Sequence, residues 1–186
     1  MSFVYNAGQE EYQSIARKID QSPEDVELIR RHVGAYAYWR YNIQGQLVSG
    51  EVQVSEHQGM FIFEHFNSRI SLSGDDIAAN DQSDHEGYVF ALKNRLHFHG
   101  MGIKYIRPII ANVVEFPFEQ YIDGIVMTVQ RNTLALMAAR FVMIHEDHVD
   151  FEMTEESKGF KSFARKIKSR IERGNSVKGV LITSDE

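Results

Sequence analysis

The chain has 186 residues, of which 43% are hydrophobic and 25% are charged, and its formal net charge is −6. A chain of this size and composition is typical of one globular domain that buries a substantial core. It contains no cysteine, which excludes disulfides, cysteine zinc ligands and a thiol nucleophile.

Residues 1–33 are expected to form a helical segment. The stretch GQEEYQSIARKI has apolar residues at the i, i+3, i+4 and i+7 positions of a helix. In the next stretch, SPEDVELIRRHV, Ser22 is a typical N-cap and Pro23 suits the first helical position. The first turn of this second helix is acidic and would repel DNA phosphates, so we expect no direct DNA binding by these helices.

Residues 34–153 have the period-two pattern of antiparallel strands. Turn sequences such as Gln58-Gly59 and Lys93-Asn94 separate short alternating runs, as in a barrel or a sandwich. The expected strands occupy residues 34–43, 46–55, 59–66, 86–92, 94–99, 103–114, 121–129, 138–146 and 148–153, with a further candidate between 68 and 73. Residues 71–87 are acidic and rich in turn formers, and we expect a long surface loop there.

The first expected strand is unusually aromatic. In GAYAYWRY and the residues after it, one face of the strand would carry Ala35, Ala37, Trp39, Tyr41 and Ile43, and the other Tyr36, Tyr38, Arg40 and Asn42. We expect the first face to line the barrel interior and the second to border a ligand or a partner. The same aromatic density also suits plain packing against a neighbouring layer, and the sequence leaves both interpretations open.

A ligand site is predicted where this strand meets its neighbours. The aromatic rings would supply apolar area, and an arginine would recognise an anionic group through its planar fork. The predicted ligand-binding residues are Tyr36, Tyr38, Trp39, Arg40, His97, His99 and Arg107.

Two pairs of histidines are candidate metal ligands. His97 and His99 share one side of a strand, and His145 and His148 flank a turn, so the pairs would bind zinc only if they met in space. Neither pair belongs to a known metal-binding motif, and the acidic loop does not match an EF-hand. The sequence contains no Gly-x-Ser-x-Gly elbow and no Gly-rich phosphate loop. We therefore expect no metal, no cofactor and no enzymatic activity, and a histidine-metal hydrolase is a third hypothesis.

Residues 154–186 are expected to form a basic amphipathic helix and one edge strand at 178–183. Eight Lys and Arg residues and one acidic residue lie between Lys158 and Lys178. The apolar stripe of the helix consists of Phe160, Phe163, Ala164, Ile167 and Ile171. Its polar face carries Lys161, Arg165, Lys166, Lys168, Arg170 and Arg173, which suits an acidic protein, RNA or a lipid surface. The edge strand would either close its own sheet or pair with a second copy, which makes a homo-oligomer plausible.

Three stretches carry a resemblance to a known group of domains. They are GAYAYWRY (34–41), GYVFALKNRLHFHG (87–100) and DGIVMTVQRNTLALMAARFVMI (123–144). The region 34–151 resembles the β-rich domain that follows the DNA-binding part of some bacterial Xre-type helix-turn-helix regulators. The matching residues are Gly34, Tyr36, Arg40, Gly87, Gly124, Ala139 and Arg140, whereas Trp39 stands where a tyrosine is usual. The resemblance implies a sensor or interaction domain in transcription regulation, and it brings no established ligand.

Together these patterns predict an α+β protein with an antiparallel β-barrel-like domain, two N-terminal helices and one C-terminal amphipathic helix. The predicted function is a non-enzymatic regulatory or sensory module that binds a small molecule or a protein partner. The alternative is an interaction protein that binds an anionic partner through its basic helix. The first twenty residues lack the apolar core of a signal peptide, and no apolar run reaches about 18 residues, so we expect a cytoplasmic protein without a membrane span.

Overall fold

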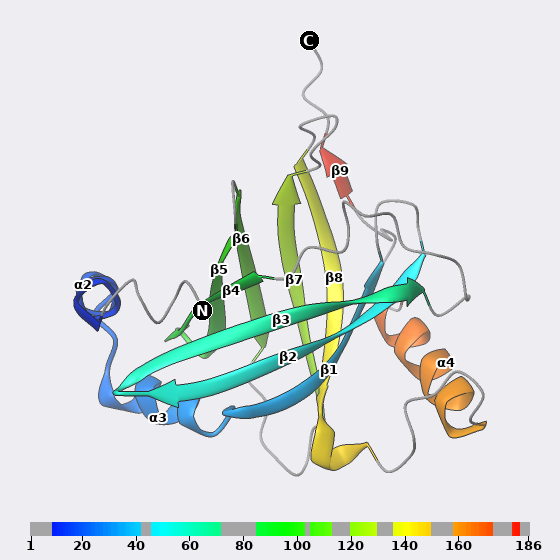
Figure 1. Ribbon diagram of the computed structural model, residues 1–186, viewed down its shortest axis with the longest axis horizontal. Coiled ribbons are helices and arrows are strands. Elements are labelled where there is room, and N and C mark those ends of the chain that lie inside the picture. The colour runs from blue at the N-terminus through cyan, green and yellow to red at the C-terminus, as the bar shows by residue number, and fades with distance from the viewer. Residues whose placement is uncertain are drawn as a thin grey trace.

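Eight consecutive strands each pair with the next, and the pairing of β1 with β8 closes them into an antiparallel barrel (Figure 1). The strands are β1 (Gly34–Tyr41), β2 (Leu47–His57), β3 (Met60–Ser71), β4 (His85–Leu92), β5 (Arg95–Gly102), β6 (Tyr105–Asn112), β7 (Tyr121–Val129) and β8 (Leu136–His145). The helices are α2 (Gln9–Lys18), α3 (Pro23–Arg30) and α4 (Lys158–Glu172). This computed structural model describes residues 9–41, 46–71, 85–102, 105–112, 120–129, 136–149, 158–172 and 180–182. The predicted α+β barrel with helices before and after it is confirmed.

Three of the predicted boundaries need correction. The expected strand 148–153 is wrong at its start, because Glu146–His148 form a short 3₁₀ helix, η2, whose first turn is capped by His145 Nδ1 accepting from the N–H of Asp147 at 3.2 Å. Residues 150–153 lie outside the described part of the chain. The candidate strand at 68–73 is the end of β3, and the expected loop 71–87 is shorter at its end because β4 begins at His85. The expected terminal edge strand is β9 (Val180–Ile182), which pairs with β8 of its own chain.

The pairing register shows which side chains face the barrel interior. Successive cross-strand pairs place on one face the buried residues Val89, Phe98, Ile109, Val126 and Ala139. The residues between them alternate to the other face, where Ile110 is 38% exposed and Ile125 is 49% exposed. The first face is therefore the packed interior, and part of the outer wall at β6 and β7 is open to solvent.

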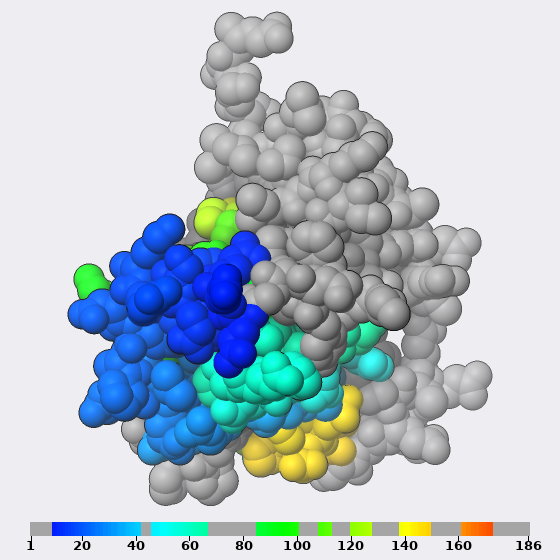
Figure 2. Space-filling model, turned by 60° about the vertical axis from the view of Figure 1, so that its left-hand side comes forward, coloured from blue at the N-terminus to red at the C-terminus, as the bar shows by residue number. Residues whose placement is uncertain are grey.

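The helices α2 and α3 cover one side and one end of the barrel (Figures 1 and 2). The ring of Tyr12 stacks on Phe90 of β4 with 4.9 Å between centroids, and Ile29 of α3 is fully buried. α3 begins with the predicted N-cap: Ser22 Oγ accepts from the N–H of Asp25, and the Asp25 carboxylate accepts from the N–H of Ser22. This capping box satisfies backbone donors that would otherwise lack partners at the helix start.

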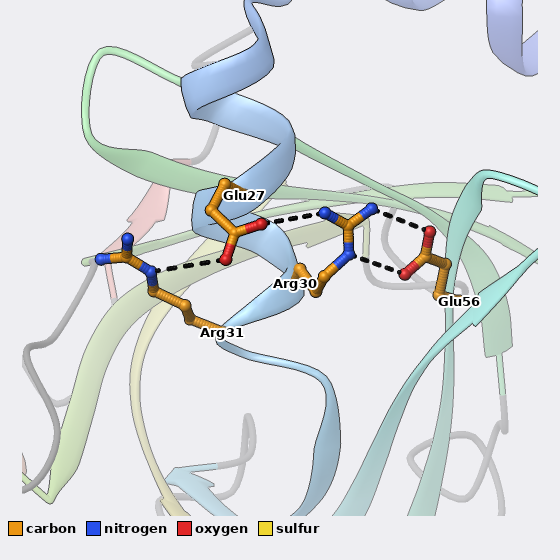
Figure 3. Close-up of polar contacts among 4 residues, drawn as sticks. All are labelled: Glu27, Arg30, Arg31 and Glu56. Carbon is orange, nitrogen blue, oxygen red and sulfur yellow. Dashed lines mark hydrogen bonds and ion pairs between the residues drawn. The ribbon is translucent and has the colours of Figure 1, made fainter.

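A charged link ties α3 to β2 (Figure 3). Arg30 donates two hydrogen bonds to the carboxylate of Glu56, both at 3.1 Å, and a third to Glu27 at 2.9 Å. The hydrogen bonds from Arg30 to Glu56 lower the pKa of the Glu56 carboxyl below its ordinary value. A pocket of about 300 Å³ lies beside α3 and is lined by Glu24, Asp25, Glu27, Leu28, Arg31 and Asn94. Asn94 is in the β4–β5 turn. Helix α3 therefore lies beside this turn, at one end of the barrel.

Helix α4 covers the outside of the barrel at β1 and β8, on the side away from α2 and α3 (Figure 1). The ring of Trp39 lies 4.9 Å from that of Phe163, edge to face, and Ile167 of α4 is fully buried in the same cluster. Arg170 of α4 donates to both carboxylate oxygens of Asp123 at 2.8–3.2 Å. The predicted apolar stripe is thus buried at Phe163, Ile167 and Ile171, while the side chain of Phe160 lies outside the described residues.

The predicted orientation of the aromatic strand is wrong. Ala37, Trp39 and Tyr41 face outward beneath α4, whereas Tyr36 and Tyr38 belong to the interior cluster. Both faces of β1 are buried, so alternation separates the two sets but does not say which set points inward. α4 needs a large apolar surface beneath it, and Trp39 supplies that surface.

Gly87 marks a place where β4 and β5 approach closely. A Cβ atom added to Gly87 would overlap the backbone carbonyl oxygen of His99 on β5, which cannot move without disturbing the ladder. We expect Gly87→Ala to lower the free energy of unfolding by about 1–3 kcal/mol, measured by urea denaturation. Glu51→Ala, on the exposed face of β2, should change it by less than about 0.5 kcal/mol. An unchanged denaturation midpoint for Gly87→Ala would contradict this close approach.

Candidate ligand-binding site

Arg40 is a charged side chain buried inside the barrel. Its side chain is on the inward face of β1, its residue is 3% exposed, and it pairs across strands with Phe141 of the interior cluster. Its Nη1 donates to the carbonyl oxygen of Tyr41 at 3.2 Å, and no described carboxylate lies within ion-pair distance of it. A guanidinium has five N–H donors, and burying its charge without an opposite charge is costly. This environment favours an anionic partner for Arg40.

Two histidines of β3 and β4 face each other inside the barrel. His65 of β3 and His85 of β4 are directly paired across strands and are 1% and 4% exposed. The Nδ1 atom of His65 lies 3.2 Å from Nδ1 and 3.1 Å from Nε2 of His85, and the ring planes meet at 85°. Since both nitrogens of His85 are equally near, the rings meet edge to face rather than through one linear hydrogen bond.

Tyr38 shares the inward face of β1 with Arg40 and contacts one of the two histidines. It lies two residues before Arg40 on the same face of β1, and its ring centroid is 4.7 Å from that of His65. The Tyr38 ring also packs against Phe141 of β8, with 5.2 Å between ring centroids. We refer to Tyr38, Arg40, His65 and His85 as the inner polar cluster. It combines one fixed positive charge, two imidazoles and a phenol within an aromatic wall.

The inner polar cluster lies toward the end of the barrel away from α3. Arg40 is the penultimate residue of β1, and His85 is the first residue of β4. The opposite end carries α3 and the β4–β5 turn. Toward that end the interior is apolar, with Phe63 5.9 Å from His85 and 5.2 Å from Phe98 between ring centroids. A small ligand would therefore meet the polar groups at the end away from α3.

Tyr36 serves to join β1 to α3. Its hydroxyl donates to the carbonyl oxygen of His32 at 2.9 Å, and burial raises the pKa of Tyr36 above its ordinary value. His32 is itself buried, with its Nδ1 2.8 Å from the carbonyl oxygen of Leu28. The hydroxyl of Tyr36 therefore has its hydrogen-bond partner within the protein.

The predicted site residues do not all come together. Tyr38 and Arg40 lie in the inner polar cluster, whereas Trp39 lies on the opposite face of β1 beneath α4. His97 and His99 alternate with the inward-facing Phe98 and so lie on the outer face of β5. The backbone of Arg107 pairs with Gly100, and its side chain lies outside the described residues.

Two members of the cluster, His65 and His85, were not predicted as site residues. His65 follows Phe61 and Phe63 at alternate positions of a predicted strand, which was a usable signal for an inward-facing polar side chain. His85 fell in the expected surface loop, so its burial was not expected. Only the pairing of β3 with β4 brings the two rings together.

The other histidines lie elsewhere: His97 and His99 are on the outer face of β5, and His145, at the end of β8, has its ring centroid 5.1 Å from that of Tyr36. The ring centroids of His97 and His99 are 6.5 Å apart, and those of His145 and His148 are 6.1 Å apart. In the described part of the chain, no three His, Cys, Asp or Glu side chains gather so that they could hold a metal ion. None of these contacts joins one pair to the other.

His97 makes stability depend on pH. Burial lowers its pKa below the ordinary 6.5, opposed in part by a hydrogen bond to the backbone of Leu92. Between the lowered and the ordinary pKa the unfolded chain binds more protons than the folded one, so the free energy of unfolding should fall as the pH drops below about 6.5. Urea denaturation at pH 7.5 and 5.5 measures this fall, and His97→Asn should reduce it. An equal fall in the variant would show that other groups cause it.

The basic face of α4 is exposed as predicted for four of its residues. Lys161, Arg165, Lys166 and Lys168 are exposed, whereas Arg170 is half-buried in its ion pair with Asp123. Arg173 lies outside the described residues. Because the apolar stripe is buried against the barrel, α4 presents only its charged side to a partner.

No described helix has the length and apolar character needed to cross a membrane. Comparison of the chain with protein-family models, with curated proteins and with solved structures finds no match. Function is therefore inferred from the buried polar residues of the barrel interior.

Proposed function

We propose that this protein is a regulatory or sensory module that binds a small anion inside its barrel. The observation that carries the proposal is Arg40, a buried guanidinium whose one hydrogen bond within the described structure goes to the adjacent carbonyl of Tyr41. An anion at this position would supply the missing opposite charge and accept the remaining N–H donors. The cost of burying Arg40 in the unliganded protein is then the basis of anion affinity.

The surroundings of Arg40 limit the size of the ligand. An eight-stranded barrel has an interior that side chains can fill or that holds one small ligand. Here the interior toward α3 is packed with the rings of Phe63 and Phe98, so a ligand at Arg40 would lie beside Tyr38 and Phe141. This environment suits a small organic acid with a short apolar or aromatic body, and an inorganic anion is the simplest case.

The regulatory role is supported by the resemblance to the β-rich domain of bacterial Xre-type regulators. A sensor needs a ligand and a surface that reports its binding. Arg40 is next to the end of β1, and Tyr41, its hydrogen-bond acceptor, donates from its hydroxyl to Glu172 of α4 at 2.7 Å. Ligand binding at Arg40 would thus act on a residue that contacts α4.

Native mass spectrometry and thermal unfolding test the proposal. Protein that has been unfolded, dialysed and refolded is titrated with sulfate, acetate, benzoate and benzenesulfonate. Stabilisation of about 2.7 kcal/mol is expected for a bound anion at one hundred times its dissociation constant. Arg40→Gln should abolish the effect, and Arg165→Gln, on the exposed face of α4, should retain it. Unchanged melting with every anion and a clean unliganded mass from cells would overturn the proposal.

The exposed face of α4 supports a second candidate function, binding of an anionic macromolecule. Four exposed cations and a buried apolar side favour a purely electrostatic contact. Binding of an RNA oligonucleotide should then weaken steeply as salt rises, and Lys161→Glu with Lys168→Glu should remove it. Absence of RNA binding at low salt would exclude RNA as the partner.

A further inference from the structure

We propose that the outer wall of the barrel around β6 and β7 is a docking surface for an acidic amphipathic helix of a partner protein. We call this surface the open wall and define it by four outward-facing residues of β6, β7 and β8: Ile110, Ile125, Met127 and Arg140. Their side chains alternate with the inward-facing ones of the same strands. The proposal is therefore independent of anion binding in the barrel interior.

The open wall exposes large apolar side chains next to one another. Ile110 of β6 pairs directly with Ile125 of β7, and the two residues are 38% and 49% exposed. Met127, two residues further along the same face of β7, is 43% exposed. Scattered exposed apolar residues are ordinary, whereas a contiguous group of them is typical of a surface that binds another protein.

The open wall also has room for one helix. Helix α2 covers β4, where Tyr12 stacks on Phe90, and α4 covers β8, where its apolar residues cluster with Val142. The strands β5, β6 and β7 lie between β4 and β8 in the sheet. With neighbouring strands about 4.8 Å apart, β4 and β8 are separated by about 19 Å around the wall. Packed helices lie about 8–10 Å from axis to axis, so one further helix fits between α2 and α4.

Arg140 indicates that this helix is acidic. Arg140 pairs with Ile125 across strands and is half-buried, and within the described residues it has no hydrogen bond or ion pair. The carboxylate of Asp123, two residues before Ile125 on β7, already accepts from Arg170. A carboxylate of the partner would pair with the Arg140 guanidinium while apolar side chains cover the isoleucines. Arginine beside apolar surface is enriched among the residues that dominate binding at protein interfaces.

A second copy of this chain does not supply such a helix from its described part. The apolar residues of α2, α3 and α4 are packed against their own barrel. The exposed face of α4 is basic and would repel Arg140. A helix of another protein, with glutamate or aspartate next to large apolar side chains, fits both the apolar surface and the charge of the open wall.

Fluorescence anisotropy with a defined peptide tests the proposal. The probe is a labelled peptide of about 18 residues, long enough to be helical in water, with leucine on one face and glutamate and alanine elsewhere. The comparison peptide has lysine in place of glutamate. We expect the glutamate peptide to bind at least about tenfold more tightly. Ile125→Glu should weaken its binding at least about tenfold, and Arg140→Glu should reverse the preference between the two peptides.

Two matched variants make the same kinds of change elsewhere on the surface. Phe66→Glu introduces a carboxylate at an apolar residue of β3 that is 46% exposed, and Arg165→Glu reverses a charge on the exposed face of α4. Both should leave the affinity for the glutamate peptide within about threefold of the wild type, since salt screens distant exposed charges. Equal binding of the two peptides overturns the proposal. Loss of binding in Arg165→Glu but not in Ile125→Glu overturns it as well.

Measurements on the wild-type protein keep the proposal falsifiable if Ile125→Glu fails to fold. The glutamate peptide should shift the methyl NMR signals of Ile110, Ile125 and Met127, and an absence of any shift overturns the proposal. A wild-type dimer in sedimentation that Ile125→Glu dissociates would assign the open wall to a second copy. Binding to phosphatidylglycerol vesicles that Ile125→Glu abolishes would assign it to a membrane surface. Either of these two results overturns the proposal.

Discussion

Replacing Arg40 with methionine should raise the stability of the unliganded protein by about 1–4 kcal/mol while it abolishes anion binding. Methionine keeps much of the length and flexibility of the side chain and removes the charge. Apolar replacement of buried charged groups is often neutral or stabilising by this amount, because the desolvation cost disappears. Urea denaturation of refolded, anion-free protein measures the stability, and calorimetry with sulfate measures the binding.

A gain in stability with a loss of binding would separate a functional arginine from a structural one. An arginine that holds the fold together should destabilise the protein when it is replaced, so a loss of more than about 2 kcal/mol would contradict our interpretation of Arg40. Arg165→Met provides the matched control, since Arg165 is exposed on α4 and its one described hydrogen bond is to the backbone of Lys161. It should leave stability within about 0.5 kcal/mol of the wild type and leave sulfate binding unchanged.

Replacing Trp39 with alanine should lower the free energy of unfolding by about 3–5 kcal/mol. Trp39 is fully buried between β1 and α4, where it meets the edge of the Phe163 ring and packs in one cluster with Ile167 and Val142. Removal of so large a side chain leaves a cavity that the sheet and the helix cannot both close. A domain of this size is usually stable by about 5–15 kcal/mol, so the loss is a large fraction of the total.

The same substitution separates packing from binding. Trp39 points away from the inner polar cluster, so folded Trp39→Ala protein should still bind sulfate with little change in affinity. Phe66→Ala provides the control for stability, because Phe66 is 46% exposed and its loss should cost less than about 0.5 kcal/mol. A cost below about 1 kcal/mol for Trp39→Ala would show that α4 does not seal this face of the barrel.

Periodicity in the sequence was sufficient to predict most of the barrel. The alternation in residues 34–153 identified the strands because successive side chains of a β-strand point to opposite faces of the sheet. The turns at Gln58-Gly59 and Lys93-Asn94 lie where the chain reverses. The helix α4 was predicted from its apolar stripe, since Phe163, Ile167 and Ile171 are spaced for one helical face. Strand alternation and the apolar stripe of a helix both depend only on residues that are close together in the sequence.

The candidate site was only partly predictable. Arg40 and Tyr38 were expected from the density of aromatic residues around a cation, and both lie in the interior. Trp39 was assigned to the same site, although alternation already places it on the opposite face of β1 from Tyr38 and Arg40. Both faces of β1 are rich in large side chains and both are buried, so the sequence did not show which face would line the site. His65 and His85, twenty positions apart, carried no shared motif.

The amino-acid sequence alone determined the element order, the antiparallel alternation and the amphipathic helix, because these follow from short-range spacing of apolar and polar side chains. Only the tertiary structure decided which face of β1 points inward, since closure of the barrel by β8 and the position of α4 depend on contacts between distant segments. The same long-range pairing of β3 with β4 placed two histidines against each other in the interior, whose wall at β1 also carries a buried arginine. Neither the contact between the histidines nor the burial of His85 follows from the sequence around either residue.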